Sequence, residues 1–423
     1  MDEAMREFAC FAIEVSLAPE LLYSRYREGV DTVRVGYGLT SGLQPERMNG
    51  KAAKCECDYY DYVSDLRFVL IVRTSHIHNP ISVLAAYPPF SSFAHVAKME
   101  STFQSTILVT GGTTGLGYEC ALAIAAQKPH ALVLICARSA ANDAAATINR
   151  ATGLANVKYL HLDLANLQGV RQFTSDFTAA RYPPLSAVVF NAALQTVGKV
   201  KYTLDGIEST FGISHVGHAL LFHLLLQHFT PNARIVITAS GTHDPAQKTG
   251  MPDAHYRTAE QLAHPDKESI KKNTGRQRYA TTKLCNVLWL YALNRRRAEK
   301  DLRFTVTGLD PGLMPGTGLA RDANPIERFV WHHVLPRILP LLRYLISPNI
   351  HAPRESGQAL ARLAIGDDIA GVSGQYFEGM QAIKSSRDSY SVEKQDDLWE
   401  WTVCFTGENH AEKERFNELQ VMS

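Results

Sequence analysis

Short apolar runs and longer amphipathic stretches alternate along the chain from about residue 105 onward. The runs are continuous and rich in β-branched residues, and helix-length segments separate them. Such runs are typical of strands buried on both faces of a parallel sheet, with helices packed on each side. The pattern predicts an α/β fold with a doubly wound parallel sheet of about seven strands, at residues 106–110, 131–137, 157–163, 185–192, 233–240, 303–312 and 374–378.

Residues 1–98 do not share this alternation. They mix helix-like, strand-like and loop-like stretches, and no repeat or low-complexity tract accounts for them. Met99 stands just before the first expected strand, where a compact α/β domain would begin. We therefore expect an N-terminal extension of uncertain order over 1–98 and one α/β domain over 99–423.

A glycine-rich turn connects the first expected strand to the helix after it. The turn reads Thr110-Gly111-x-x-x-Gly115-x-Gly117, and residues without a Cβ let a charged ligand approach the backbone N–H groups. The following helix would present its positive end to the same ligand. In a βαβ unit this arrangement is typical of a dinucleotide site. The residues expected to hold the phosphates are Gly111, Thr113, Thr114, Gly115, Leu116 and Gly117.

The ends of the next strands carry further candidate contacts to a dinucleotide. About 20 residues past the last glycine, where an NAD site has a carboxylate, this chain has Arg138. A guanidinium suits a 2′-phosphate and favours NADP(H) over NAD(H), whereas a solvated surface arginine would leave the coenzyme open. Asp163 ends the third strand, where it could accept a hydrogen bond from an adenine amino group. Asn191 ends the fourth, beside small residues that would let a nicotinamide ribose lie against the backbone.

Tyr279 and Lys283 are four residues apart in an expected helix, so their side chains share one face. A neighbouring ammonium is expected to lower the pKa of Tyr279 toward neutrality, as a general acid or base near pH 7 needs. Ser240 offers a hydroxyl at the end of the fifth strand, at the sheet edge where α/β folds bind ligands. A lone Tyr-x-x-x-Lys also occurs by chance on exposed helix faces, so the pair depends on its context.

Composition and charge narrow the class of protein. The 423 residues include 43 Lys and Arg against 42 Asp and Glu, a formal net charge of +1, so the balance does not predict nucleic-acid binding. Seven scattered cysteines fit free thiols in a reducing compartment, and we expect a cytoplasmic protein. No metal site is expected, because Cys55 and Cys57 lack a second pair and His215 and His218 lack an acidic or thiol partner nearby.

Taken together, these motifs resemble the short-chain dehydrogenase/reductase family. The resemblance covers residues 103–395, about seven tenths of the chain, in the family's order. It implies a Rossmann-type fold and an NADP(H)-dependent oxidoreductase. The motifs that carry it are the glycine turn, Asn191-Ala192-Ala193, Ser240, Tyr279-x-x-x-Lys283 and Asp310-Pro311-Gly312.

The resemblance also implies a role for each of these side chains. Tyr279 would pass a proton to the substrate oxygen, and Ser240 would hydrogen-bond the carbonyl. Lys283 would adjust the pKa of Tyr279 and hold the nicotinamide ribose. Pro311 and Gly312 would continue the coenzyme wall.

One position departs from the family pattern. This branch usually has Asn-His-Leu-Gly-His where the chain has Ser214-His215-Val216-Gly217-His218, so serine replaces the asparagine of the usual tetrad. In the family that asparagine holds a water that links the lysine to solvent. We expect Ser214 to anchor such a water less rigidly and to reduce activity without abolishing it.

Two further stretches, 211–225 and 283–289, resemble the branch that holds retinol-dehydrogenase-like enzymes and protochlorophyllide reductases, and 308–319 is similar to fungal and bacterial members. The leading hypothesis is interconversion of a ketone and an alcohol on a bulky hydrophobic molecule, in secondary-metabolite biosynthesis. A C=C reductase of the protochlorophyllide-reductase type is the alternative within this class. A catalytically weak nucleotide-binding scaffold is the alternative outside it, with Ser214 as its main support.

The family places a substrate lid at about residues 315–350, and a strongly apolar stretch, 328–346, lies within it. Arg337 and Arg343 interrupt this stretch, so we expect no transmembrane span. An apolar lid predicts a lipophilic substrate. Core packing would explain the same residues, as would docking onto a membrane face or a partner subunit. Members of the family are usually homodimers or tetramers, so a homodimer is a further expectation.

Overall fold

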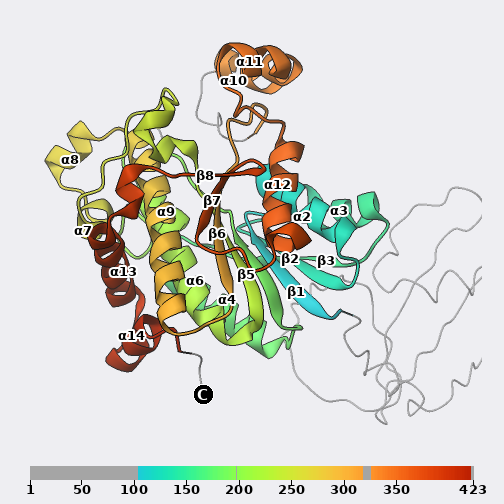
Figure 1. Ribbon diagram of the computed structural model, residues 1–423, viewed down its shortest axis with the longest axis vertical. Coiled ribbons are helices and arrows are strands. Elements are labelled where there is room, and N and C mark those ends of the chain that lie inside the picture. The colour runs from blue at the N-terminus through green and yellow to red at the C-terminus, as the bar shows by residue number, and fades with distance from the viewer. Residues whose placement is uncertain (1–102, 197, 318–324, 421–423) are drawn as a thin grey trace, which may run out of the picture. The chain divides into compact units, whose positions relative to one another are not determined.

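The computed structural model describes residues 103–196, 198–317 and 325–420 (Figure 1). The chain divides into two units, Met1–Lys98 and Met99–Ser423, and every described residue belongs to the second. The extension expected over 1–98 therefore lies outside the described residues.

An eight-stranded sheet forms the centre of the described domain, in the order β3-β2-β1-β4-β5-β6-β7-β8. All neighbouring pairs from β3 to β7 are parallel, which confirms the expected Rossmann-type fold. The strand order reverses between β1 and β4, and open α/β sheets bind ligands at this switch point. The strands are β1 Ser105–Thr110, β2 Ala131–Ala137, β3 Val157–His161, β4 Leu185–Phe190, β5 Phe229–Thr238, β6 Thr305–Asp310, β7 Gln375–Glu378 and β8 Gln381–Ile383.

The edge strand β8 is the one strand that the apolar pattern does not predict. It has three residues, pairs antiparallel with β7, and exposes the side chains of Gln381 and Ala382. Gly379 and Met380 form the connecting turn, and Gly379 has a φ of +53°. Hairpin turns require this left-handed backbone, which glycine adopts without strain.

Alternate residues of each central strand pack into two separate cores. Leu108 of β1 faces one core, whereas Ile107 and Val109 face the other. In β2, Leu134 faces the same core as Leu108, and Val133 faces the other core. Since side chains of a strand point to opposite faces in turn, a continuous apolar run is what a sheet covered on both faces requires.

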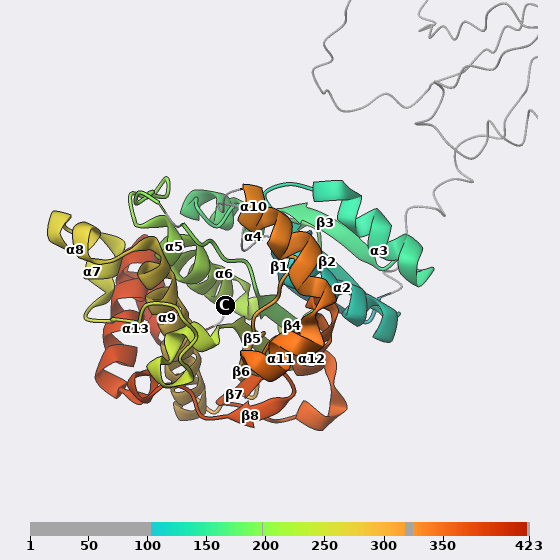
Figure 2. The ribbon, with the colours of Figure 1, turned by 90° about the horizontal axis from the view of Figure 1, so that it is seen from above.

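Helices cover both faces of the sheet (Figures 1 and 2). Buried residues of α2, α3 and α12 belong to the core on one face, and those of α4, α6, α9 and α13 to the core on the other. The helices are α2 Gly115–Gln127, α3 Ala144–Thr152, α4 Leu167–Ala179, α5 Ser209–Phe211, α6 Gly217–Leu225, α7 Ala259–Ala263, α8 Lys267–Lys272, α9 Gly275–Glu299, α10 Pro325–Phe329, α11 Leu339–Leu345, α12 Pro353–Ile365, α13 Val392–Thr406 and α14 His410–Asn417.

The run Ser209–His228 is helical throughout and contains a π-helical turn at Gly212–Val216. It is the one helix of the described residues that is long and apolar enough to cross a membrane, with a mean hydropathy of 1.2. Since 89% of that apolar window is buried inside the protein, it is a core helix. Its π turn contains Ser214, and such turns often occur at functional sites.

Candidate active site

The turn between β1 and α2 has the backbone geometry that its glycines predict. Gly111 and Gly115 have φ values of +65° and +56°, in the left-handed region. A Cβ on Gly117 would lie 2.6 Å from the side-chain nitrogen of Asn191 and 2.8 Å from the Gly111 carbonyl carbon, so only glycine fits there. A Cβ on Gly115 would meet nothing within 4 Å, so the backbone at this point faces open space. A phosphate can therefore approach the N–H groups of the turn.

Hydrogen bonds fix the end of β4 against this turn. The Asn191 side chain donates from Nδ2 to the Thr110 carbonyl at 2.9 Å. The backbone N–H groups of Asn191 and Ala192 donate to Thr110 Oγ1 at 2.9 and 3.0 Å. The same hydroxyl contacts Nε2 of His218 at 2.9 Å. The ends of β1, β4 and α6 are thus tied together at the switch point.

A cleft of about 1430 Å³ opens along the carboxyl ends of the strands, larger than the pocket of a single drug-sized ligand. It has room for a dinucleotide and a second molecule side by side. The structure brings every candidate site residue except Ser214 into its walls. These residues are Gly111, Thr113, Thr114, Gly115, Leu116, Gly117, Arg138, Asp163, Asn191, Ser240, Tyr279, Lys283, Pro311 and Gly312.

Arg138 and Asp163 lie at the end of the cleft formed by β2 and β3. Arg138 follows β2 with an exposed side chain, and its guanidinium forms no ion pair or hydrogen bond within the part of the chain that the structure describes. The Asp163 carboxylate accepts the N–H of Ala165 at 3.0 Å through Oδ1, which fixes its orientation. A cation is thus available where an NADP-specific site needs one.

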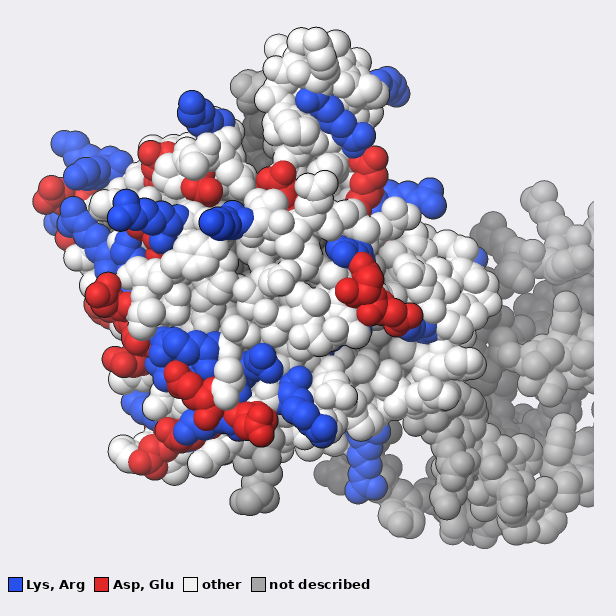
Figure 3. Space-filling view, viewed as in Figure 1, with Lys and Arg blue, Asp and Glu red and all other residues white. Residues whose placement is uncertain are grey.

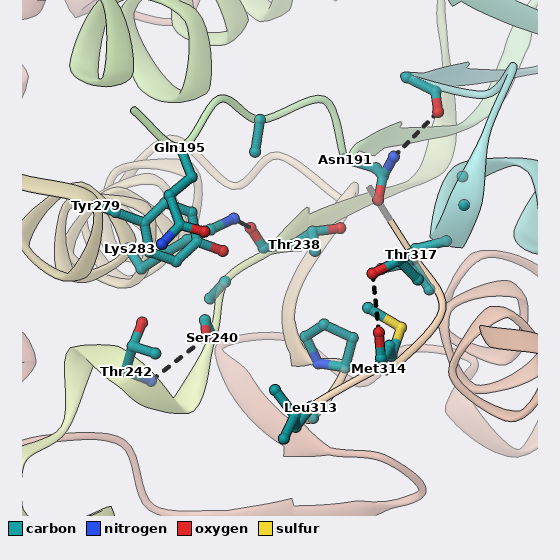
Figure 4. Close-up of a pocket in the computed structure, with 18 of the residues that line it drawn as sticks. Asn191, Gln195, Thr238, Ser240, Thr242, Tyr279, Lys283, Leu313, Met314 and Thr317 are labelled. Atoms are coloured by element: carbon teal, nitrogen blue, oxygen red, sulfur yellow. Dashed lines mark hydrogen bonds between the residues drawn. The ribbon is translucent and has the colours of Figure 1, made fainter. Parts of the chain in front are cut away.

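Helix α9 holds Tyr279 and Lys283 at the middle of the cleft, where Figure 4 shows them beside Gln195 and near Ser240. The helix begins after Thr274, whose side chain accepts the N–H of Gln277 and caps it. Lys283 Nζ lies 5.6 Å from the centroid of the Tyr279 ring. The ammonium donates to the Thr238 carbonyl at 3.0 Å, so its position is set by the end of β5.

The pKa of Tyr279 moves in the direction opposite to the sequence-based expectation. Burial raises it and the Asp310 carboxylate raises it further, while a hydrogen bond with the Ser240 side chain lowers it. Burial also lowers the pKa of Lys283 to about 8, against the opposing effect of Asp310. The expectation of an acidic phenol was wrong because it counted the neighbouring charge and not the cost of burying a phenolate.

Asp310 belongs to the Asp310-Pro311-Gly312 motif, but the sequence argument assigned no role to its side chain. Its side chain is buried at the end of β6 and lines the cleft. Its carboxylate accepts the Gly312 N–H at 3.0 Å and the Asn349 side-chain amide at 2.7 Å. It raises the pKa of both Tyr279 and Lys283, an effect that adds to that of burial for the tyrosine and opposes it for the lysine. An acidic residue at the last position of a fully buried strand is the signal that could have revealed its role.

Ser214 lies behind the cleft rather than in its wall. It is 1% exposed, and its hydroxyl accepts the N–H of Leu194 at 3.2 Å. Its carbonyl contacts Nδ1 of His218 at 3.2 Å. The serine thus supports the loop after β4. Any link that it makes between Lys283 and solvent would have to pass through an intervening group.

The paired histidines of this helix are held by other side chains. His215 Nε2 contacts the hydroxyl of Thr402 at 3.1 Å, and His218 is held by Thr110 and the Ser214 carbonyl. Burial lowers the pKa of each histidine to about 3. The described residues contain no group of three or more His, Cys, Asp or Glu that could hold a metal ion.

Part of the expected lid lies outside the described residues, at 318–324. The rest contributes an apolar wall opposite the catalytic helix. Trp331 lines it and donates from its indole N–H to the Thr317 carbonyl at 2.9 Å. Its other apolar members include Leu313, Met314, Ile326, Val330, Leu335 and Ile346.

Comparisons with known proteins identify the family of the chain. Residues 105–252 match the family described as short chain dehydrogenase, and residues 320–413 match one described as AcuH dehydrogenase domain. A protochlorophyllide reductase from Avena sativa is 30% identical, over 71% of this chain and 99% of its own. A polyprenol dehydrogenase from Homo sapiens is 28% identical, over 71% of this chain and 84% of its own.

A solved structure from Mycobacterium paratuberculosis, of an uncharacterized protein, shares the fold. It superposes with a TM-score of 0.51 at 21% identity and covers 73% of this chain and 96% of its own. The chain belongs to the short-chain dehydrogenase/reductase family and is an enzyme of that NAD(P)(H)-using class.

Proposed function

We propose that this enzyme reduces a ketone to an alcohol, or oxidises the alcohol, on a bulky hydrophobic secondary metabolite with NADP(H) as coenzyme. The observation that carries the proposal is the position of Tyr279, Lys283 and Ser240 between the bare glycine turn and an apolar wall. One side of the cleft suits phosphates and the other suits a lipophilic molecule, with the proton-transfer groups between them.

The residues present fit NADPH. The open backbone at Gly115 admits the pyrophosphate, and Arg138 supplies a cation for the 2′-phosphate at the far end. Asp163, after β3, and Asn191, after β4, stand to either side of these two groups, where they would contact the adenine and the nicotinamide ribose. When bound, NADPH supplies the hydride for the reduction.

The catalytic residues provide the proton. The Ser240 hydroxyl would hydrogen-bond the substrate carbonyl oxygen, and the Tyr279 hydroxyl would donate its proton to the same oxygen. A raised pKa keeps the phenol protonated at neutral pH, which suits a proton donor. With a pKa of about 8, Lys283 is mostly protonated at pH 7, so its ammonium stabilises the phenolate left after the transfer.

The substrate would lie against the lid. Trp331, Val330 and Leu335 offer aromatic and aliphatic surface, and Gln195 offers a polar contact beside Tyr279 (Figure 4). This lining supports a polyketide-like or other polycyclic ketone over a small polar one.

Substitution of the proton donor tests the reaction. NADPH oxidation by the purified enzyme with a panel of aromatic and polycyclic ketones is expected to fall by about 10²–10⁴-fold in Tyr279→Phe. NADPH binding, followed by fluorescence titration, should be retained. Tyr291→Phe is the matched control, because Tyr291 lies on the same helix but hydrogen-bonds Ser385 away from the cleft. Equal loss in both variants would contradict the proposal.

Arg138 tests the choice of coenzyme. Loss of one charge-assisted contact in Arg138→Ala should weaken NADPH binding by about 10- to 100-fold and leave NADH binding nearly unchanged. Arg150→Ala is the control, since Arg150 is exposed on α3 outside the cleft. A parallel loss for both coenzymes would refute specificity for the phosphate.

Reduction of a C=C bond is the second candidate, favoured by the 30% identity to protochlorophyllide reductases. Cys285, a thiol on the same helix as Tyr279, is fully buried in the core and does not line the cleft. Enone substrates separate the two candidates, because mass and NMR analysis of the product distinguishes an alcohol from a saturated ketone.

A further inference from the structure

The lid carries an unusual amount of exposed apolar surface. We define the lid surface as Ile326, Phe329, Val330, Val334, Leu341, Tyr344, Leu345 and Ile346. These eight side chains, from a stretch of 21 residues, are more than half of the fifteen large exposed hydrophobic side chains in the described part of the protein. Tyr344 is 87% exposed and Ile326 77%. Such a concentration of exposed apolar side chains in one segment indicates an interaction site.

The lid surface stands away from the body of the domain. Figure 1 shows α10 and α11 projecting beyond the edge of the sheet, and none of the described side chains of 325–346 is buried. The projecting lobe is mostly uncharged in Figure 3, with blue side chains along its side. The segment therefore adds little to the core, and its apolar side chains need another explanation.

The charges on the segment identify what it would contact. Residues 325–346 contain three arginines and one acidic residue, Glu327. Arg328 and Arg337 are exposed, whereas Arg343 pairs with Glu355 of α12. Short helices that present aromatic and aliphatic side chains together with arginines bind the headgroup and acyl boundary of anionic membranes.

A second copy of the chain fits this surface less well. A two-fold interface through the lid surface would bring together Arg328 and Arg337 of both copies, against one acidic residue of the segment, Glu327, in each copy. Burying unpaired charges is costly. An anionic leaflet neutralises the same arginines without burying them.

The lid surface is also continuous with the substrate cleft. Ile326, Val330 and Ile346 are exposed and line the cleft at the same time. We propose that the lid surface docks onto an anionic lipid bilayer and that the substrate enters the cleft directly from the membrane. The second half of this proposal rests on the proposed lipophilic substrate, but the first half does not.

The full-length protein tests docking by flotation with lipid vesicles. Binding is expected to vesicles of phosphatidylcholine mixed with phosphatidylserine, to be weaker with phosphatidylcholine alone, and to weaken at high salt. A triple variant, Phe329→Ser with Tyr344→Ser and Leu345→Ser, should bind about tenfold or more weakly. These three side chains do not line the cleft. Arg328→Glu with Arg337→Glu should remove the preference for the anionic vesicles.

A matched triple variant carries the same changes elsewhere, as Leu204→Ser with Met380→Ser and Val392→Ser. These side chains are exposed to similar extents outside the lid, so this variant should bind like the unmodified protein. Equal loss in both triple variants, or no vesicle binding by the unmodified protein, would overturn the proposal. So would a lid variant that converts a dimer to a monomer in sedimentation without lipid, since a protein interface would then cover the surface.

An assay with a soluble ketone and no vesicles distinguishes failure of the proposed function from failure of membrane docking. Vesicle binding without NADPH-dependent turnover of any ketone would refute the proposed function and leave docking in place. Turnover of ketones without vesicle binding would refute docking alone.

Discussion

The two walls of the cleft differ in how firmly the rest of the protein holds them. On the catalytic wall, Lys283 is 2% exposed and the end of β5 holds its ammonium. On the lid wall, no described side chain of 325–346 is buried. Chemistry at the catalytic wall needs fixed positions, whereas the lid needs only apolar area. Each wall therefore predicts a different response to mutation.

The glycine turn should respond most strongly. Ala at position 117 would place its Cβ 2.6 Å from the Asn191 amide and against the Gly111 backbone, so the turn must shift. Gly117→Ala is expected to lower kcat/KM by about 10²-fold through misplacement of the coenzyme. It should also reduce the free energy of unfolding by about 1–3 kcal/mol. Steady-state kinetics and urea denaturation measure the two effects.

Gly153→Ala is the control for backbone strain alone. Gly153 ends α3 with a φ of +70°, and a Cβ there would meet nothing within 4 Å. Its substitution should cost about 1 kcal/mol of stability and leave kcat/KM unchanged. If Gly117→Ala behaved like Gly153→Ala, close packing at the turn would not explain the need for glycine.

A pair of tryptophans compares the two walls directly. Trp331→Phe, in the lid, should raise KM for a bulky ketone about tenfold and leave the urea midpoint unchanged. Trp289→Phe, in α9 and 2% exposed, should lower stability by about 2 kcal/mol and leave KM unchanged. A large stability loss in Trp331→Phe would show that the lid belongs to the core.

The same contrast explains what could be predicted from the sequence. The strands, the glycine turn and the Tyr279–Lys283 spacing are local patterns, and each local pattern fixes its own geometry. The common position of the strand ends then brings Ser240, Asn191 and Arg138 into one cleft. For these features the topology of the sheet supplies the long-range contacts.

Other features depend on neighbours that no local pattern identifies. Burial of the phenol and the Asp310 carboxylate at the end of β6 both raise the pKa of Tyr279, so the direction of this shift could not be predicted from α9 alone. Ser214 occupies the position of the asparagine in the family motif, yet the π turn places its hydroxyl against Leu194 instead of in the cleft. The lid sequence is equally apolar whether it is buried or exposed, so only the structure distinguishes the two.

Asp310 should shift the pH dependence of the reaction. Its carboxylate raises the pKa of Lys283, which burial holds at about 8, so Asp310→Asn should lower this pKa further. The ammonium would then be lost at a lower pH, and the alkaline limb of the kcat/KM profile for ketone reduction should move to lower pH. At pH 7 we expect a loss of a few fold, about the worth of one hydrogen bond.

Glu378→Gln is the matched control, because Glu378 is a second carboxylate of the cleft wall that shifts neither Tyr279 nor Lys283. The alkaline limb of the kcat/KM profile of Glu378→Gln should match that of the unmodified enzyme. Identical profiles for the unmodified enzyme and Asp310→Asn would remove Asp310 from the account of proton transfer.

Ser214 should give the smallest effect, because it stands behind the cleft. In Ser214→Asn the longer side chain can still accept the Leu194 N–H through its oxygen, and its NH₂ group can hold a water near Lys283. Turnover is expected to rise by about two- to tenfold, the worth of one hydrogen bond in the relay. Stopped-flow measurement of the hydride-transfer step separates this gain from changes in product release.

Ser214→Ala provides the opposite change. It removes the acceptor of the Leu194 N–H, so the loop after β4 loses a buried hydrogen bond and turnover should fall. A fall in Ser214→Ala without a rise in Ser214→Asn would mean that the serine only supports this loop. The proton of Lys283 would then reach solvent by a route that does not involve position 214, and the departure from the family motif would carry no catalytic cost.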